Sequence, residues 1–319
     1  MKKQMRYVMQ IVTLLLAILL LPFSVFAEKS LIPMGHSIGV ELQLQSVYIT
    51  NDVLLKNGAW LKAGDTIQTM NSQEIHTLQE VRSLYTSASG KMIDVKIKRQ
   101  QKTQHIKLKK EELEPVLSFF RDQTDGIGTL TFIDPETKEY GALGHQIIDS
   151  VVAAPPKFKS GSIFYASIEQ IKKSVPGEPG YKISSIEHNA GQLGSIAENN
   201  VYGIFGKWSN ALEQGFPKPM EIMQPSEIKV GKAQLLTTIE GKKVEAFDVK
   251  ITKIDDKSLQ FEVTDAQLKK KTGGILQGMS GSPIIQNGRF AGAVTHMFIE
   301  SPEKGAAIPL TEMLKKQPS

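Results

Sequence analysis

The sequence contains no cysteine. This absence excludes disulfide bonds, thiolate nucleophiles and cysteine-ligated zinc sites, so hydroxyl, imidazole and carboxylate groups must carry any chemistry. The fold must also be held by hydrophobic cores alone. Hydrophobic residues make up 40% of the chain and charged residues 22%, a composition that excludes wholesale disorder. A length of 319 residues is enough for two domains.

The chain also lacks a strong excess of either charge. Its formal net charge is +5, but Lys2, Lys3 and Arg6 supply three of the 38 basic residues in a segment without acidic residues. Beyond residue 27 the chain holds 35 basic and 33 acidic residues, a net charge of +2. This balance gives no electrostatic case for nucleic-acid binding, and no nucleic-acid partner is predicted.

An apolar run, Val12–Phe26, follows the basic start of the chain and ends at the cleavage-like tripeptide Val25-Phe26-Ala27. This is the layout of a secretory signal. Residues 1–27 are therefore predicted to be a signal peptide or, because residues 9–27 are long enough to span a bilayer, a retained membrane anchor. Both readings place the protein outside the cytoplasm, either anchored to the membrane or secreted.

Long helical patterns are scarce in the rest of the chain. Between residues 28 and 110 only one helix is predicted, beginning with the capping box Thr77–Glu80. It places Leu78, Val81, Leu84, Tyr85 and Ala88 on one face. Alternating apolar residues predict strands at Met92–Ile97 and His105–Leu108. This texture indicates a small β-barrel with one flanking helix.

Residues 28–110 resemble a PDZ domain. The resemblance rests on the loop Pro33–Val40, the turn Ala63-Gly64-Asp65-x-Ile67 with Asn71 after it, the helix, and the strand Val95-x-Ile97-x-Arg99. It implies a groove in which an extended peptide adds as a strand beside Ile38–Leu42. The peptide-binding residues implied by the resemblance are Gly35, His36, Ser37, Ile38 and Gly39.

A charged segment, Lys109–Pro115, interrupts the strand pattern, and residues 111–117 are predicted to be a linker. Beyond it, residues 118–319 form many short apolar stretches separated by turn residues. This pattern favours an all-β sandwich or a pair of barrels over a βαβ fold.

The segment Gly278-Met279-Ser280-Gly281-Ser282-Pro283 is typical of a serine nucleophile loop, and a turn is expected after it at Asn287-Gly288. A tight turn flanked by glycines lets backbone N–H groups converge beside the serine hydroxyl. Ser280 is the predicted nucleophile, and the amides of Gly278 and Ser280 are the predicted oxyanion hole. Ser282 suits the role less well because no glycine stands two residues before it. The same residue types also suit a simple turn between strands.

A serine nucleophile needs a base, usually histidine. His145 is favoured because it ends a strand and follows the small residues of Gly141–Gly144. His296 lies on the strand after the nucleophile loop, where a cleft-lining or core position is expected. The other histidines lie in the first domain or in a polar loop: His36, His76, His105 and His188.

Two aspartates are candidates for the acid that orients His145. Asp149 follows His145 by four residues, and Asp265 ends a strand and precedes Ser280 by fifteen residues. Either aspartate could instead cap a turn. The residues alone do not decide between Asp149 and Asp265.

The second domain closely resembles the SpoIVB (stage IV sporulation protein B) peptidase family, and the PDZ-like region extends the resemblance. It is carried by Gly126–Thr131, Gly141–His145, Val263–Asp265, Thr272–Pro283 and Gly292–His296. The resemblance implies a serine peptidase with a chymotrypsin-like double β-barrel, and it places a catalytic triad on His145, Asp265 and Ser280.

The same resemblance implies a role in sporulation signalling. The enzyme would cleave a membrane-bound regulator between mother cell and forespore, which leads to activation of a late sporulation sigma factor. The PDZ domain would bind a peptide from the protein itself or from its substrate. No cofactor and no metal ion are expected.

Two other classes of protein fit the sequence less well. An α/β-hydrolase esterase requires Gly-x-Ser-x-Gly, whereas Ser282 occupies the last position of that pattern here. A non-catalytic PDZ-containing scaffold protein of the cell envelope is the main alternative to the peptidase.

Overall fold

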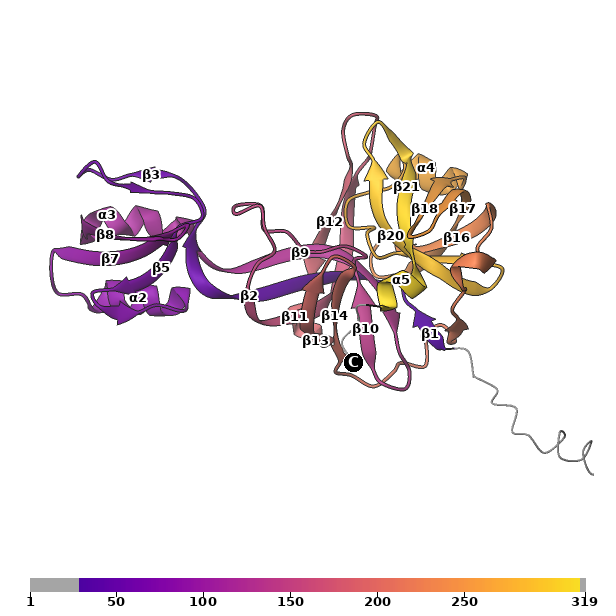
Figure 1. Ribbon diagram of the computed structural model, residues 1–319, viewed down its shortest axis with the longest axis horizontal. Helices are drawn as coiled ribbons and strands as arrows, with labels where there is room; N and C mark the ends of the chain where they lie inside the picture. The colour runs from indigo at the N-terminus through magenta and orange to yellow at the C-terminus, as the bar shows by residue number, and fades with distance from the viewer. Residues whose placement is uncertain (1–28, 316–319) are drawn as a thin grey trace, which may run out of the picture.

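The computed structural model describes residues 29–315 as a mainly β protein. A small lobe lies at one end, and two β-barrels pack side by side at the other (Figure 1). The signal peptide or anchor expected at residues 1–27 lies outside the described residues. Between residues 29 and 315, no helix is both long and apolar enough to cross a membrane.

The first barrel is formed by six strands that pair in the closed circuit β2–β9–β10–β14–β13–β11. Their apolar side chains alternate inward, and Ile38, Leu42 and Leu130 are fully buried in the core. The strands are β2 Ser37–Ile49, β9 Phe120–Ile133, β10 Glu139–Ala142, β11 Phe158–Lys172, β13 Gly194–Asn200 and β14 Gly203–Trp208.

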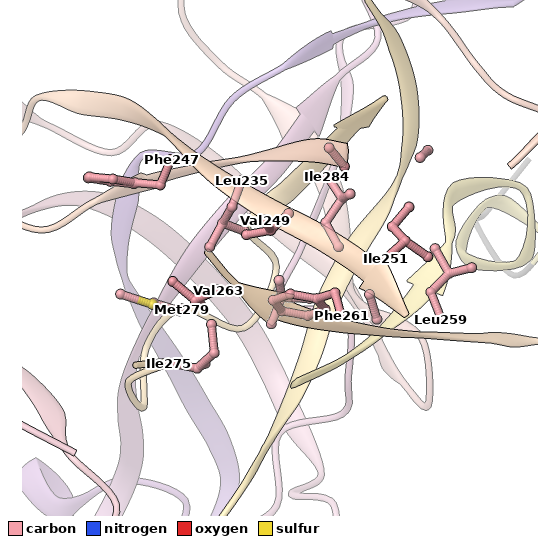
Figure 2. Packing of buried hydrophobic residues seen from close by; sticks show 14 of the residues in the cluster. Leu235, Phe247, Val249, Ile251, Leu259, Phe261, Val263, Ile275, Met279 and Ile284 are labelled. Atoms are coloured by element: carbon pink, nitrogen blue, oxygen red, sulfur yellow. The ribbon is translucent and has the colours of Figure 1, made fainter. Parts of the chain in front are cut away.

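The second barrel is closed in the order β16–β17–β18–β21–β20–β19. Figure 2 shows its core, in which Leu235, Phe261 and Ile284 come from three different strands. The expected turn Asn287-Gly288 joins β19 to β20, and both of its residues have positive φ. The strands are β16 Gly231–Thr238, β17 Val244–Asp255, β18 Ser258–Val263, β19 Pro283–Gln286, β20 Arg289–Phe298 and β21 Ser301–Pro309.

Shorter elements border the two barrels. Helix α4 lies between β18 and the nucleophile loop, and β12 extends the first barrel by pairing with β11. Their bounds, with those of the other short elements, are α4 Ala266–Thr272, α5 Leu310–Leu314, β1 Ser30–Pro33, β12 Tyr181–Ile186, β15 Met220–Glu221, η2 His188–Ala190 and η3 Pro225–Glu227. The expected mainly β fold with a pair of barrels is thus confirmed.

The small lobe contains the predicted helix and strands around its own core. Helix α2 begins at the predicted capping box, in which Thr77 and Glu80 bond reciprocally, and Val81 is fully buried. The elements of the lobe are β3 Val53–Leu54, β4 Trp60–Leu61, β5 Thr66–Met70, β6 Gln73–Glu74, α2 Leu78–Ser87, β7 Met92–Arg99, β8 Lys102–Lys109, α3 Lys110–Leu113 and η1 Glu114–Phe119.

The boundary between lobe and barrels differs from the one predicted at residue 110. Strand β1 pairs with β9, and the first half of β2 pairs with β9 and β11, so residues 30–44 belong to the first barrel. Strands β2 and β9 then continue into the lobe (Figure 1). Composition does not reveal this boundary, because one uninterrupted strand serves both units.

Residues 111–117, predicted to be a linker, form α3 and the start of η1 instead. Leu113 and Val116 are buried in the core of the lobe. The charged neighbours of these two residues face solvent. Their number made the segment resemble a linker in the sequence. The segment is therefore part of the lobe.

The five residues predicted to bind a peptide in the PDZ-like domain also lie in the first barrel. Ile38 is fully buried in the barrel core, Ser37 is 2% exposed, and a Cβ on Gly35 would lie 2.9 Å from the carbonyl oxygen of Leu236 in the second barrel. This corrects the predicted peptide groove at Gly35–Gly39: Gly35 permits close packing of the two barrels, and the stretch is not an open groove on the lobe.

Candidate active site

The nucleophile loop, residues 277–282, is held by both barrels. The N–H of Thr129 in the first barrel donates to the carbonyl of Ser280 at 3.1 Å, and the N–H of Gly281 donates to the carbonyl of Val294 in the second barrel at 2.7 Å. A Cβ on Gly281 would stand 2.3 Å from the Thr129 carbonyl oxygen, so only glycine fits there. Ser280 therefore sits at the junction of the barrels.

Met279 anchors the loop in the second barrel. Its side chain is fully buried and lies in the cluster that contains Val263 and Ile275 (Figure 2). Successive side chains of an extended chain point in opposite directions. With Met279 pointing into the core, the side chain of Ser280 points toward the surface of the barrel. Ser280 is partly exposed, in agreement with this placement.

The predicted oxyanion amides are available for a ligand. Within residues 29–315, neither the N–H of Gly278 nor that of Ser280 donates a hydrogen bond. Gly278 has a φ of 92°, a conformation that favours glycine. Both residues line a pocket of about 580 Å³. The loop can therefore present two backbone donors to one bound oxygen.

His145 lines the same pocket as Ser280. It follows β10 after a sharp turn in which Leu143 and Gly144 have φ values of 73° and 68°. The imidazole Nδ1 lies 2.9 Å from the carbonyl oxygen of Gln146. Since a carbonyl only accepts, Nδ1 carries the proton in the neutral ring and Nε2 is free to accept one. This is the tautomer that a general base needs.

Asn199, in β13, fixes the segment that carries His145. Its Oδ1 accepts from the N–H of Ile147 at 2.8 Å, and its Nδ2 donates to the Ile147 carbonyl at 3.0 Å. Gln146 Nε2 donates to the carbonyl of Asn199 at 3.1 Å. Sequence reasoning missed Asn199 because no local motif marks it; only the barrel brings it beside Ile147.

The hydroxyl of Ser280 donates to the carbonyl of Thr295 at 3.1 Å. His145 and Ser280 share the pocket but are not hydrogen-bonded to each other here, as is common for nucleophiles without substrate. His296 also lines the pocket, which is one of the two positions expected for it. Its ring centroid lies 5.8 Å from that of His145. Partial burial, and then the nearby His145, lower the pKa of His296.

Asp265, the predicted acid, is not brought to His145. Its carboxylate accepts from the N–H of Leu268 at 2.8 Å and caps the N-terminus of α4. Asp265 does not line the pocket that holds His145 and Ser280. In this structure its role is to start the helix that leads into the nucleophile loop.

Asp149, the other candidate acid, is engaged elsewhere. Its Oδ2 accepts from the hydroxyl of Tyr48 at 2.8 Å, and its Oδ1 accepts from the N–H groups of Val151 and Val152. Among the described residues no carboxylate is hydrogen-bonded to His145. The Gln146 carbonyl is the group that orients the imidazole.

Ser282, the alternative nucleophile, is fully buried. Its hydroxyl donates to Thr237 at 3.0 Å and does not line the pocket.

The walls of the pocket are largely apolar. Among the described residues that line it, Asp125 is the one acidic or basic side chain apart from the histidines. The apolar lining includes Ile127, Ile147, Ile148, Ile275, Met297 and Ile299.

A comparison with protein-family models matches residues 116–314 to the family described as SpoIVB peptidase S55. Among solved structures, the chain is similar to the Rv3671c protease of M. tuberculosis in its active form, with 14% identity, a TM-score of 0.35, and coverage of 60% of this chain and 73% of that chain. For the inactive form the values are 14%, 0.34, 60% and 82%. The comparison with curated protein sequences gives no match. Because the family match spans more than half of its length, the chain belongs to the SpoIVB peptidase S55 family of serine peptidases.

Proposed function

We propose that this serine peptidase cleaves peptide bonds with Ser280 as nucleophile, His145 as general base, and the amides of Gly278 and Ser280 as the oxyanion hole. The observation that carries the proposal is their convergence on one pocket from loops of both barrels. Two unengaged amides and an imidazole with a free Nε2 are the groups that acyl transfer requires.

The reaction begins when the Ser280 hydroxyl turns from the Thr295 carbonyl toward His145. Nε2 of His145 accepts the hydroxyl proton as the serine oxygen attacks the substrate carbonyl. The negative charge that develops on the carbonyl oxygen is stabilised by the two amides. The imidazolium then gives its proton to the leaving amine, while the Gln146 carbonyl keeps Nδ1 protonated throughout.

A fluorophosphonate probe tests this assignment, because it reacts with an activated serine hydroxyl. We expect labelling of the wild type and of Ser282→Ala, no labelling of Ser280→Ala, and labelling of His145→Ala slowed by at least about 100-fold. Mass spectrometry of the labelled peptide identifies the site. An unlabelled wild type, or equal labelling of Ser280→Ala, contradicts the proposal.

The capping role of Asp265 is separable from a role in a triad. Asparagine caps a helix about as well as aspartate, whereas alanine does not. Asp265→Asn should therefore keep kcat within about threefold of wild type, and Asp265→Ala should lose about 1 kcal/mol of unfolding free energy. Peptide hydrolysis measures kcat, and urea unfolding measures the free energy of unfolding. A drop in kcat of about 10⁴ in Asp265→Asn would instead place Asp265 in a triad.

The apolar walls of the pocket favour substrates with apolar side chains next to the scissile bond. Burying one such side chain contributes about 1.5–3 kcal/mol, or roughly 10- to 100-fold in kcat/KM. Fluorogenic peptides that carry Leu, Lys or Glu at this position measure the preference. We expect Leu to lead by this margin, and Ile299→Lys to raise the relative value for Glu. Equal values for the three peptides refute the apolar preference.

The cellular role proposed for the chain is the sporulation signalling of its family: cleavage of a membrane-bound regulator outside the cytoplasmic membrane. The lobe, proposed to be a PDZ domain, would hold a peptide and gate the peptidase. A hollow of about 620 Å³ lined by β5, β6 and β7 offers a place for that peptide, with Gln68, His76 and Lys98 among its walls.

Immunoblots of the regulator during sporulation test this role. In a strain that carries Ser280→Ala, the regulator should stay intact. In a strain in which a Gly-Ser turn replaces residues 50–119, cleavage should begin earlier, because the gate is gone while both barrels keep their own cores. Unchanged cleavage in the first strain refutes the role, and unchanged timing in the second refutes gating.

A further inference from the structure

Lys182, on strand β12, has a buried side chain without a carboxylate partner. Its Nζ donates to the hydroxyl of Ser37 at 3.1 Å, the carbonyl of Gly278 at 3.3 Å and the hydroxyl of Thr237 at 3.4 Å. Only 6% of the residue surface is exposed. Burial lowers the pKa of this lysine to about 7. No acidic side chain within the described residues forms an ion pair with it.

A buried amine without a charged partner destabilises the fold. An amine transferred from water to a protein interior is destabilising unless a charged partner compensates, and hydroxyl groups compensate only in part. An apolar side chain of the same length would pack there at lower free energy. The contacts of Lys182 with the nucleophile loop indicate what the lysine contributes instead.

The backbone at the start of β12 holds Gln277, the residue before Gly278, by two hydrogen bonds. The N–H of Gln277 donates to the carbonyl of Gly180 at 2.9 Å, and the N–H of Lys182 donates to the carbonyl of Gln277 at 3.4 Å. The carbonyl and the N–H of a trans peptide point in opposite directions. With the Gln277 carbonyl turned toward β12, the N–H of Gly278 therefore points away from β12.

The next peptide is held from the other side of Gly278. Its carbonyl accepts from Nζ of Lys182 and, at 2.7 Å, from the hydroxyl of Thr129. The aliphatic part of Lys182 also packs beneath Gly278, since a Cβ on this glycine would lie 3.4 Å from Cδ of the lysine. A glycine with a φ of 92° rotates easily unless both adjoining peptides are fixed.

We propose that Lys182 is a positioning residue that fixes the Gly278 carbonyl and thereby aims the Gly278 amide at the developing oxyanion. The proposal rests on the proposed function of Ser280 and Gly278. Lys182 itself lies outside the pocket and does not touch the substrate.

The variant Lys182→Met keeps the length of the side chain and removes the amine. We expect kcat for an apolar fluorogenic peptide to fall at least tenfold with KM within threefold of wild type. The inhibition constant of a matching peptide aldehyde, whose adduct needs the oxyanion hole, should rise by a similar factor.

Thermal unfolding separates this role from a merely structural one. Because the buried amine destabilises the folded protein, Lys182→Met should melt at a higher temperature than wild type at pH 6. The pKa of Lys182 is lower in the folded than in the unfolded protein, so the penalty is complete below pH 7 and declines as the pH rises toward 10.5. The difference in Tm should therefore be smaller at pH 9.

Lys172→Met is the matched control, because this lysine lies on the neighbouring strand and is exposed. It should leave kcat unchanged. A Lys182→Met variant with wild-type kcat and aldehyde affinity refutes the positioning role, and so does one that loses stability and activity together. An inactive wild type that no fluorophosphonate labels would instead overturn the proposed function.

Discussion

The docking of one tight loop between two barrels is the constraint on which the site depends. Thr129 of the first barrel bonds the backbone of Ser280, and Val294 of the second bonds the backbone of Gly281. Gly281 leaves no room for a side chain at this contact, and Met279 ties the loop to the second core. The position of Ser280 is therefore set by the packing of the barrels rather than by the loop sequence alone.

Charge contributes little to the arrangement of the site. The imidazole of His145 is oriented by a backbone carbonyl, and Asp265 and Asp149 are occupied by a helix N-terminus and by Tyr48. In the proposed mechanism, fixed peptide dipoles take over what a carboxylate supplies in the familiar triad. In that mechanism the rate depends on how rigidly the Gly278 and Ser280 amides are held.

Features that depend on near neighbours could be predicted from the sequence. The capping box at Thr77–Glu80 and the turn at Asn287-Gly288 agree with the structure. The local motifs around His145 and Ser280 also singled out two residues that the structure places in one pocket. Features that depend on long-range pairing could not. The membership of residues 30–44 in the first barrel, and the contacts of Asn199 and Lys182, arise from strands far apart in the chain. The resemblance placed Asp265 in a triad, whereas in this structure its carboxylate caps α4 and does not line the pocket that holds His145.

The central claim is that Ser280, the two amides and His145 act together on one bound oxygen and its neighbouring carbon. A crystal structure of the protein phosphonylated by a fluorophosphonate tests this most directly. The account predicts a phosphonyl oxygen about 2.7–3.1 Å from the amide nitrogens of Gly278 and Ser280, with Nδ1 of His145 still on the Gln146 carbonyl. A phosphonyl oxygen remote from both amides, or a carboxylate bonded to His145, would contradict it.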